Sequence, residues 1–149
     1  MKKLLLALTA LCVSATIVAQ DELLQKYTEM GDVNTTYVSR GMLDQVPLEQ
    51  FNVPGLSEIA RRIDNMKVLV SRGDKMGKEL GTKVPKQLLK RGFEEKLNTK
   101  REEVTVRILQ SKRDPSRVVM VLYQKPHATV VSMKGDFSEG LEGLMPPVE

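Results

Sequence analysis

The chain has 149 residues, of which 28% are charged and 41% hydrophobic, and its formal net charge at pH 7 is +4. One cysteine, one histidine and no tryptophan exclude a disulfide scaffold and the usual cysteine–histidine zinc sites. A chain of this length can form one domain with a real hydrophobic core, so neither a metal nor a partner is required for folding.

The first nineteen residues predict an export signal. Two lysines follow Met1, residues 4–18 are uncharged and mostly apolar, and Ala19 precedes a polar stretch, which is the order of a secretory signal peptide. The apolar run is too short and too interrupted by Ser and Thr for a stable transmembrane anchor, and Leu11 before Cys12 disfavours lipidation. We therefore expect cleavage near Ala19, or a residue or two away, and a mature periplasmic or secreted domain over residues 20–149.

The first half of this domain begins with a predicted helix, because Leu23, Tyr27 and Met30 recur on one helical face. Residues 33–39 are rich in β-branched and aromatic side chains, which favours a strand. A helical turn over residues 41–46 and a loop over 47–54 are expected next. Apolar residues spaced i, i+3, i+4, i+7 then predict an amphipathic helix over residues 55–64, and a strand over 66–70 follows.

The second half begins with residues 75–99, which have helical composition but contain Gly77, Gly81 and Pro85. Two helices or one kinked helix are predicted, the second with a buried stripe of Leu89, Phe93 and Leu97. Residues 104–109 and 118–123 predict a β-hairpin across the turn at 114–116. Residues 129–133 predict a last strand, and residues 138–145 a short helix.

This order of elements predicts an α+β domain. We expect a single mixed, mostly antiparallel sheet of four to five strands with helices packed on one face. The connection from residues 66–70 to residues 104–109 is long enough to make those two strands parallel.

Four segments also carry a resemblance to a known family: residues 27–30, 33–43, 55–69 and 130–137, the last with Lys134-Gly135-Asp136. In this order they resemble an exported Bacteroidetes family catalogued as domain of unknown function 4252. The resemblance implies an exported α+β domain without an established activity, sometimes encoded beside extracytoplasmic sigma-factor systems. It implies a role in envelope stress or signalling but no functional residues.

Catalytic patterns are weak. His127 lies in a predicted turn, and although Ser132 and Asp136 are near in sequence, no nucleophile and orienting partner are marked for it. The adjacent carboxylates of Glu94-Glu95 and of Glu102-Glu103 would point apart on a helix or a strand. This disfavours either pair as the general acid and base of glycoside hydrolysis. There is no phosphate loop, dinucleotide motif or calcium loop. We therefore expect no enzyme, no cofactor and no metal site.

Charge is unevenly distributed along the chain. Residues 61–117 contain 17 basic and 8 acidic side chains, whereas the segments on either side are acidic. Nucleic acid is excluded as a partner by export and by the absence of interleaved aromatic residues. The candidate surface for an anionic partner comprises Lys83, Lys86, Lys90, Arg91 and Lys96. The alternative is a solvated face that pairs with nearby acids.

Three hypotheses for function follow. The first, which we prefer, is a non-catalytic cell-envelope protein that acts through contact with another envelope protein, as a monomer or weak dimer, in an accessory or signalling role. The second is a binding module for anionic lipid or polysaccharide, whose binding is lost with salt. The third is a hydrolase with an unrecognised site, whose activity is abolished by His127→Ala.

Overall fold

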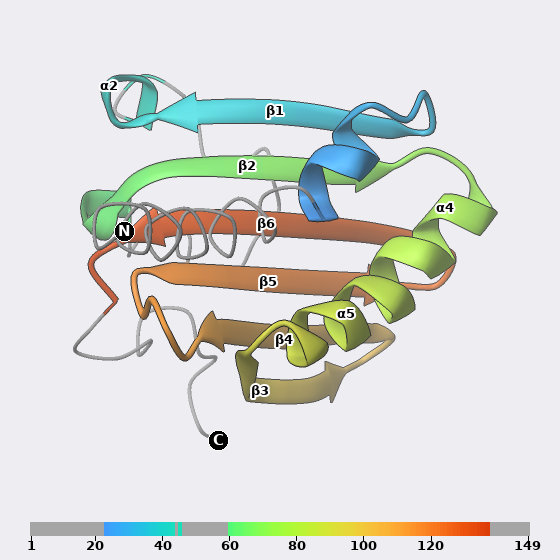
Figure 1. The fold of residues 1–149 in the computed structure, drawn as a ribbon. Helices are drawn as coiled ribbons and strands as arrows, with labels where there is room; N and C mark the ends of the chain where they lie inside the picture. The colour runs from blue at the N-terminus through green and yellow to red at the C-terminus, as the bar shows by residue number, and fades with distance from the viewer. Residues whose placement is uncertain (1–22, 44, 46–59, 138–149) are drawn as a thin grey trace, which may run out of the picture.

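The structure is a computed structural model that describes residues 23–43, 45 and 60–137. These residues form one six-stranded sheet in the order β1-β2-β6-β5-β4-β3 (Figure 1). The strands are β1 (Val33–Ser39), β2 (Ile63–Ser71), β3 (Phe93–Arg101), β4 (Val104–Ser111), β5 (Arg117–Gln124) and β6 (His127–Gly135). The helical elements are residues 23–28, α2 (Arg40–Leu43), the 3-10 turn η2 (Ala60–Arg62), α4 (Asp74–Lys78), the π-helical turn η3 (Glu79–Lys83) and α5 (Val84–Lys90).

The predicted α+β class is confirmed, but two details of the sheet are wrong. The described sheet has six strands rather than four to five, and it is not mixed, because every neighbouring pair is antiparallel. The parallel crossover to residues 104–109 is also wrong, since β2 and β4 run in opposite directions (Figure 1). The connection through α4, η3 and α5 leads instead to β3, at the far edge of the sheet.

The additional strand is β3, which the sequence pattern placed in a helix. The helix ends at Lys90, and Gly92 with φ 93° turns the chain out of it. A β-bulge between Glu95 and Leu97 then shifts the register. Phe93 consequently packs on the helix side of the sheet and Leu97 on the other side. A bulged strand with two apolar residues four apart lacks the alternation of a regular strand, so its spacing imitates a helix.

The sheet separates two apolar clusters. The helix-side cluster includes Leu23, Tyr27 and Leu80, which pack with strand residues such as Leu69 and Val121. The cluster on the other face is built by a different set: Val38, Leu43, Ile63, Met66, Val68, Ile108, Val118, Met120, Val131, Met133 and Phe137. Because both faces of the central strand β5 are buried, this strand has a nearly continuous apolar sequence.

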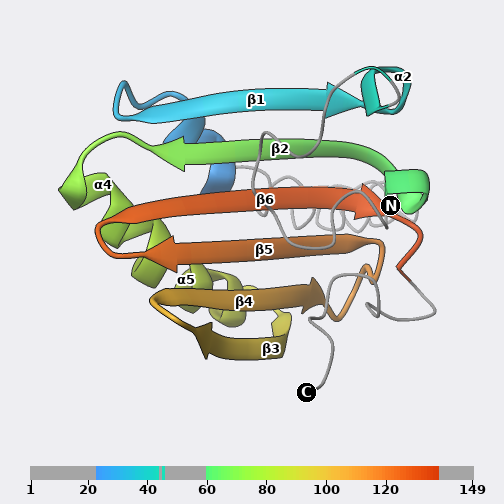
Figure 2. The ribbon, with the colours of Figure 1, turned by 180° about the vertical axis from the view of Figure 1, so that it is seen from behind.

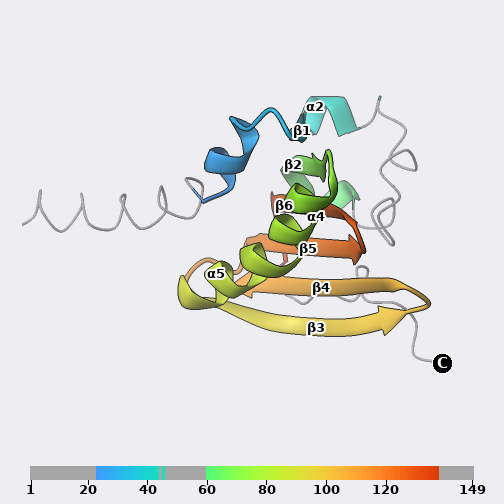
Figure 3. The same ribbon diagram turned by 90° about the vertical axis from the view of Figure 1, so that its right-hand side faces the viewer.

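Helices α4 and α5 lie on one face of the sheet, as Figure 3 shows in side view, and Figure 2 shows them behind the strands. The sequence predicted a break at Gly77 and Gly81. At these positions the structure instead has one uninterrupted helical run over residues 74–90, with a π-helical turn in the middle. Pro85 lies in the first turn of α5, as expected. Among the described residues, no helix is both long and apolar enough to cross a membrane.

The other predicted elements have mixed outcomes. The strand predicted over residues 33–39 coincides with β1, and the hairpin of β4 and β5 is confirmed. Most of the helix predicted over residues 55–64 lies outside the described residues. Its final part is wrong, because η2 ends at Arg62 and Ile63 begins β2. The signal peptide and the helix predicted over residues 138–145 also lie outside the described residues.

Gly77 and Gly81 are two positions where the helical run comes very close to the sheet and its β5–β6 turn. A Cβ atom on Gly77 would lie 1.7 Å from the carbonyl oxygen of Pro126, and one on Gly81 would lie 2.3 Å from Cδ2 of Tyr123. Neither approach leaves room for a methyl group. The two glycines are therefore contact points between the helical run and the sheet.

We expect Gly77→Ala to lower the free energy of unfolding by about 1–3 kcal/mol, because the helix must move away from the turn between β5 and β6. The control is Gly41→Ala in α2, where a Cβ atom meets nothing within 4 Å. Urea denaturation of both variants measures the difference. Equal unfolding midpoints for the two variants would contradict the close contact.

Candidate functional site

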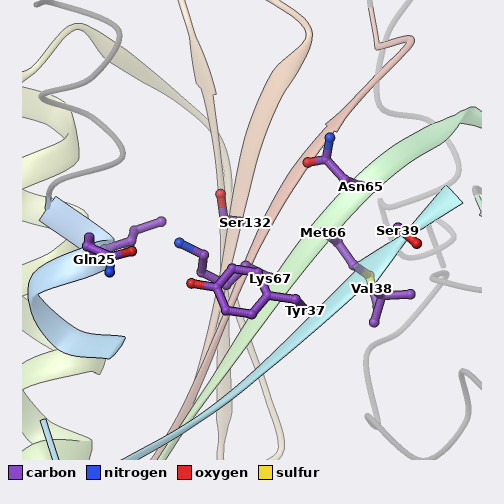
Figure 4. Close-up of a pocket in the computed structure, with 9 residues that line it drawn as sticks. Gln25, Tyr37, Val38, Ser39, Asn65, Met66, Lys67 and Ser132 are labelled. Atoms are coloured by element: carbon purple, nitrogen blue, oxygen red, sulfur yellow. The ribbon is translucent and has the colours of Figure 1, made fainter. Parts of the chain in front are cut away.

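The described structure contains a hollow of about 450 Å³ where the helical segment 23–28 meets strands β1, β2 and β6. We call it the edge groove. It is lined by Leu24, Gln25, Tyr37, Val38, Ser39, Asn65, Met66, Lys67 and Ser132 (Figure 4). A volume of this size accommodates a small ligand or a few side chains of a partner.

The centre of the edge groove is a row of three polar side chains. Tyr37, Lys67 and Ser132 are direct neighbours across β1, β2 and β6. The Lys67 Nζ lies 4.9 Å from the centroid of the Tyr37 ring, which is a cation–π contact. Lys67 forms no salt bridge with a described acidic residue. Its positive charge is therefore held in place by an aromatic ring and remains available to a carboxylate.

Tyr37 is the exposed part of this row. Its side chain is 55% accessible, the highest value among the large hydrophobic residues exposed in the described structure. The alternation that places Val33, Thr35 and Tyr37 on one face of a strand was visible in the sequence. Sequence analysis nevertheless missed Tyr37 and Lys67 as site residues, because their contact joins two strands that are distant along the chain.

The wall of the edge groove is the helical segment 23–28. It is anchored by Leu23, Leu24 and Tyr27, which are all buried in the helix-side cluster or beside it. Burial, and in second place the negative charge of Glu79, raise the pKa of Tyr27. These contacts hold the helical segment 23–28 against the helical run over residues 74–90.

Beyond the central row, the same face of the sheet continues with basic residues. Lys134 lies opposite Asn65 on one side and Arg117 on the other. Asp114 lies 3.4 Å from Arg117. Hydrogen bonds from Ser116, above all that of its hydroxyl, together with the charges of Arg117 and Lys134, lower the pKa of Asp114. An ionised Asp114 thus offsets part of the positive charge at this end of the sheet.

The structure divides the predicted anionic-partner surface. Lys83 pairs with Glu79 at 3.5 Å, and Lys96 pairs with Glu94 at 3.3 Å, so both are partly neutralised. Lys86 is exposed on α5.

Of the five, Lys90 and Arg91 meet in one hollow of about 500 Å³. Lys26 joins them there, together with Leu23 and Gln87. Sequence analysis missed Lys26, which comes from the acidic N-terminal part of the chain.

The other chemical candidates are spread apart. His127 is exposed at the start of β6, whereas Asp136 follows the end of that strand. Ser132 lies in the edge groove. Glu95 forms an ion pair with Arg107, and Glu102 lies in the turn between β3 and β4. Within the described ranges, no group of three or more His, Cys, Asp or Glu side chains is placed to hold a metal ion.

Comparison with known proteins gives one match. Residues 27–140 match a family model described as "Domain of unknown function (DUF4252)". No curated protein and no solved structure matches the chain.

The lowered pKa of Asp114 has a consequence for stability. Because the folded pKa lies below the unfolded one, the contribution is complete above the unfolded value of about 3.8 and is lost as pH falls through the folded value. We expect Ser116→Ala to raise the pKa of Asp114 and to lower stability at pH 7, with the difference from wild type shrinking below pH 4. Carboxyl NMR titration and urea denaturation at pH 7 and pH 3 measure both effects. Ser39→Ala, at an exposed position, is the control, and an unchanged Asp114 pKa in Ser116→Ala would contradict the assignment.

Proposed function

The chain belongs to the DUF4252 family, and we propose that it is an exported, non-catalytic protein of the cell envelope that acts by binding another envelope protein. The observation that carries the proposal is the edge groove, with Tyr37 exposed and fixed by Lys67. An accessory or signalling role in the envelope fits a protein that acts by contact.

The chemistry of the edge groove suits a protein partner. An exposed tyrosine supplies a large, rigid contact area with a polar tip, and such residues are frequent at the energetic centre of interfaces. Lys67 beside it can pair with an aspartate, a glutamate or a chain terminus. The neutral side chains of Gln25, Asn65 and Ser132 add hydrogen-bonding groups around this charge. We therefore propose that the partner inserts a segment with an acidic side chain.

Site-specific photo-crosslinking tests this proposal. A photoreactive phenylalanine derivative replaces Tyr37 in the full chain, and the cells that make the protein are irradiated. We expect one dominant adduct with another protein, and we expect it to decrease in a second variant that also carries Lys67→Ala.

The matched control carries the same photoreactive residue in place of Leu89, which is 41% accessible on α5. The same adducts from both positions, or no adduct with another protein from position 37, would count against the edge groove as a protein-binding site.

A second candidate function has one observation in its favour, the hollow where Lys26, Lys90 and Arg91 meet. Three basic side chains around one hollow suit a phosphate or carboxylate group of an anionic lipid or polysaccharide. This candidate uses the basic middle region of the chain and one lysine from outside it.

Sedimentation with vesicles that contain phosphatidylglycerol tests this candidate. If it is right, the protein sediments with the vesicles at low salt, and raised salt releases it because exposed charges are screened. Lys26→Gln combined with Lys90→Gln should weaken this binding at least several-fold. The control, Lys75→Gln with Lys112→Gln, removes the same charge from two other exposed positions. Equal loss in both double variants would show a general charge effect and would reject a site at the hollow.

A further inference from the structure

The outer edge of β1 presents backbone groups that the sheet does not use. The N–H of Arg72 donates to the carbonyl of Asp32 at 2.6 Å, so these opposite residues form a hydrogen-bonded pair just before β1. Hydrogen-bonded and non-hydrogen-bonded pairs alternate along an antiparallel ladder. The even-numbered residues of β1 therefore bond to β2, and the odd-numbered residues direct their N–H and C=O groups outward.

The outward groups at the two ends of β1 meet other parts of the described chain. The N–H of Val33 donates to the carbonyl of Met30 at 3.2 Å. The outward N–H and C=O groups of Thr35 and Tyr37 form no hydrogen bond with any described residue, whereas Ser39 leads directly into α2. Such a row of donors and acceptors is a template for another strand.

The two edges of the sheet differ in how they discourage pairing. The far edge, β3, contains five charged side chains and a bulge, which are features that block strand addition. In contrast, β1 has the sequence VNTTYVS, without charge, proline, glycine or bulge. Among the described residues, one edge of the sheet is protected and the edge at β1 is not, so an interaction at β1 is favoured.

We propose that a second copy of this chain pairs with β1, antiparallel and about a twofold axis, and joins the two sheets into one. Full overlap of β1 with its copy centres the pairing on Thr36, with Val33 opposite Ser39 and Thr35 opposite Tyr37. Thr35 and Tyr37 then form the hydrogen-bonded pairs, as their outward groups require. The interface is self-complementary, as a twofold contact must be.

Charge at the ends of β1 favours a copy over an unrelated strand. Asp32 precedes the strand and Arg40 follows it, and both are exposed. Full antiparallel overlap places Asp32 of one copy opposite Arg40 of the other, at both ends of the interface. The Arg40 Nη1 donates to the carbonyls of Ala60, Arg61 and Ile63 at 2.7–3.0 Å, which holds the guanidinium beside the strand end. No like charges face each other within the paired strands.

The pairing goes beyond the proposed function and does not require it. The twofold axis stands perpendicular to the sheet, so the helix-side faces of both copies lie on the same side. Two edge grooves would then flank the new pair of strands. A partner protein with two binding segments would meet both grooves at once.

A single cysteine tests the register directly. In the full chain carrying Cys12→Ser, Thr36→Cys is the sole cysteine. At the twofold axis it faces its own copy in a non-hydrogen-bonded pair, where Cα atoms lie about 4.5 Å apart, within disulfide range. We expect a covalent dimer on mild oxidation. Asn98→Cys, exposed on β3, is the matched control and should remain monomeric. No dimer with Thr36→Cys, or equal dimer with both variants, would overturn the proposal.

Sedimentation equilibrium gives a second measurement without cysteine chemistry. Thr36→Lys brings two like charges together at the axis and should weaken the dimer at least tenfold, whereas Asn98→Lys should not. The pairing would be overturned if the wild-type protein is monomeric at every protein concentration used in the sedimentation experiment. If position 37 still crosslinks to another protein in that case, the proposed function stands without the pairing of β1.

Discussion

The contact between the helical run 74–90 and the sheet determines much of this structure. Gly77 approaches the turn between β5 and β6 closely enough that its missing side chain is essential, and Gly81 does the same against Tyr123. This contact holds the crossover flat across β6, β5 and β4, so that β3 is added at the far edge (Figure 1). The segment 23–28 packs beside the same run through Leu23 and Tyr27, and the edge groove forms between that segment and strands β1, β2 and β6.

The two edges of the sheet have opposite characters. The strand reached by the crossover, β3, is charged, bulged and protected by its ion pairs, including the one between Glu95 and Arg107. The first strand, β1, is neutral and regular, and its exposed Tyr37 lies on the rim of the edge groove. Both proposals concern this side of the molecule, where the aromatic ring and outward backbone groups of β1 lie beside the cation of Lys67 on β2.

Several elements were predictable because their patterns are local. The β-branched run of β1 and the alternating or continuous apolar runs of β4, β5 and β6 have the lengths and composition of strands, and the structure confirms them. The strand β3 was not predictable in this way, since its bulge placed Phe93 and Leu97 on opposite faces and removed the alternation. The predicted basic surface was only partly informative, because Lys83 and Lys96 pair with neighbouring acids while Lys90 and Arg91 meet the distant Lys26.

By itself, the sequence determined the α+β class, most of the strands and the family resemblance, because apolar spacing and turn residues act over a few positions. Only the tertiary structure decided the strand order and the antiparallel sense of all described pairs. The tertiary structure showed why positions 77 and 81 have no room for a side chain larger than that of glycine. It also decided the edge groove, where Tyr37, Lys67 and Ser132 come from three strands. These features depend on which segments meet across the sheet, and such meetings are set by packing between residues far apart in the chain, for which the local pattern contains no signal.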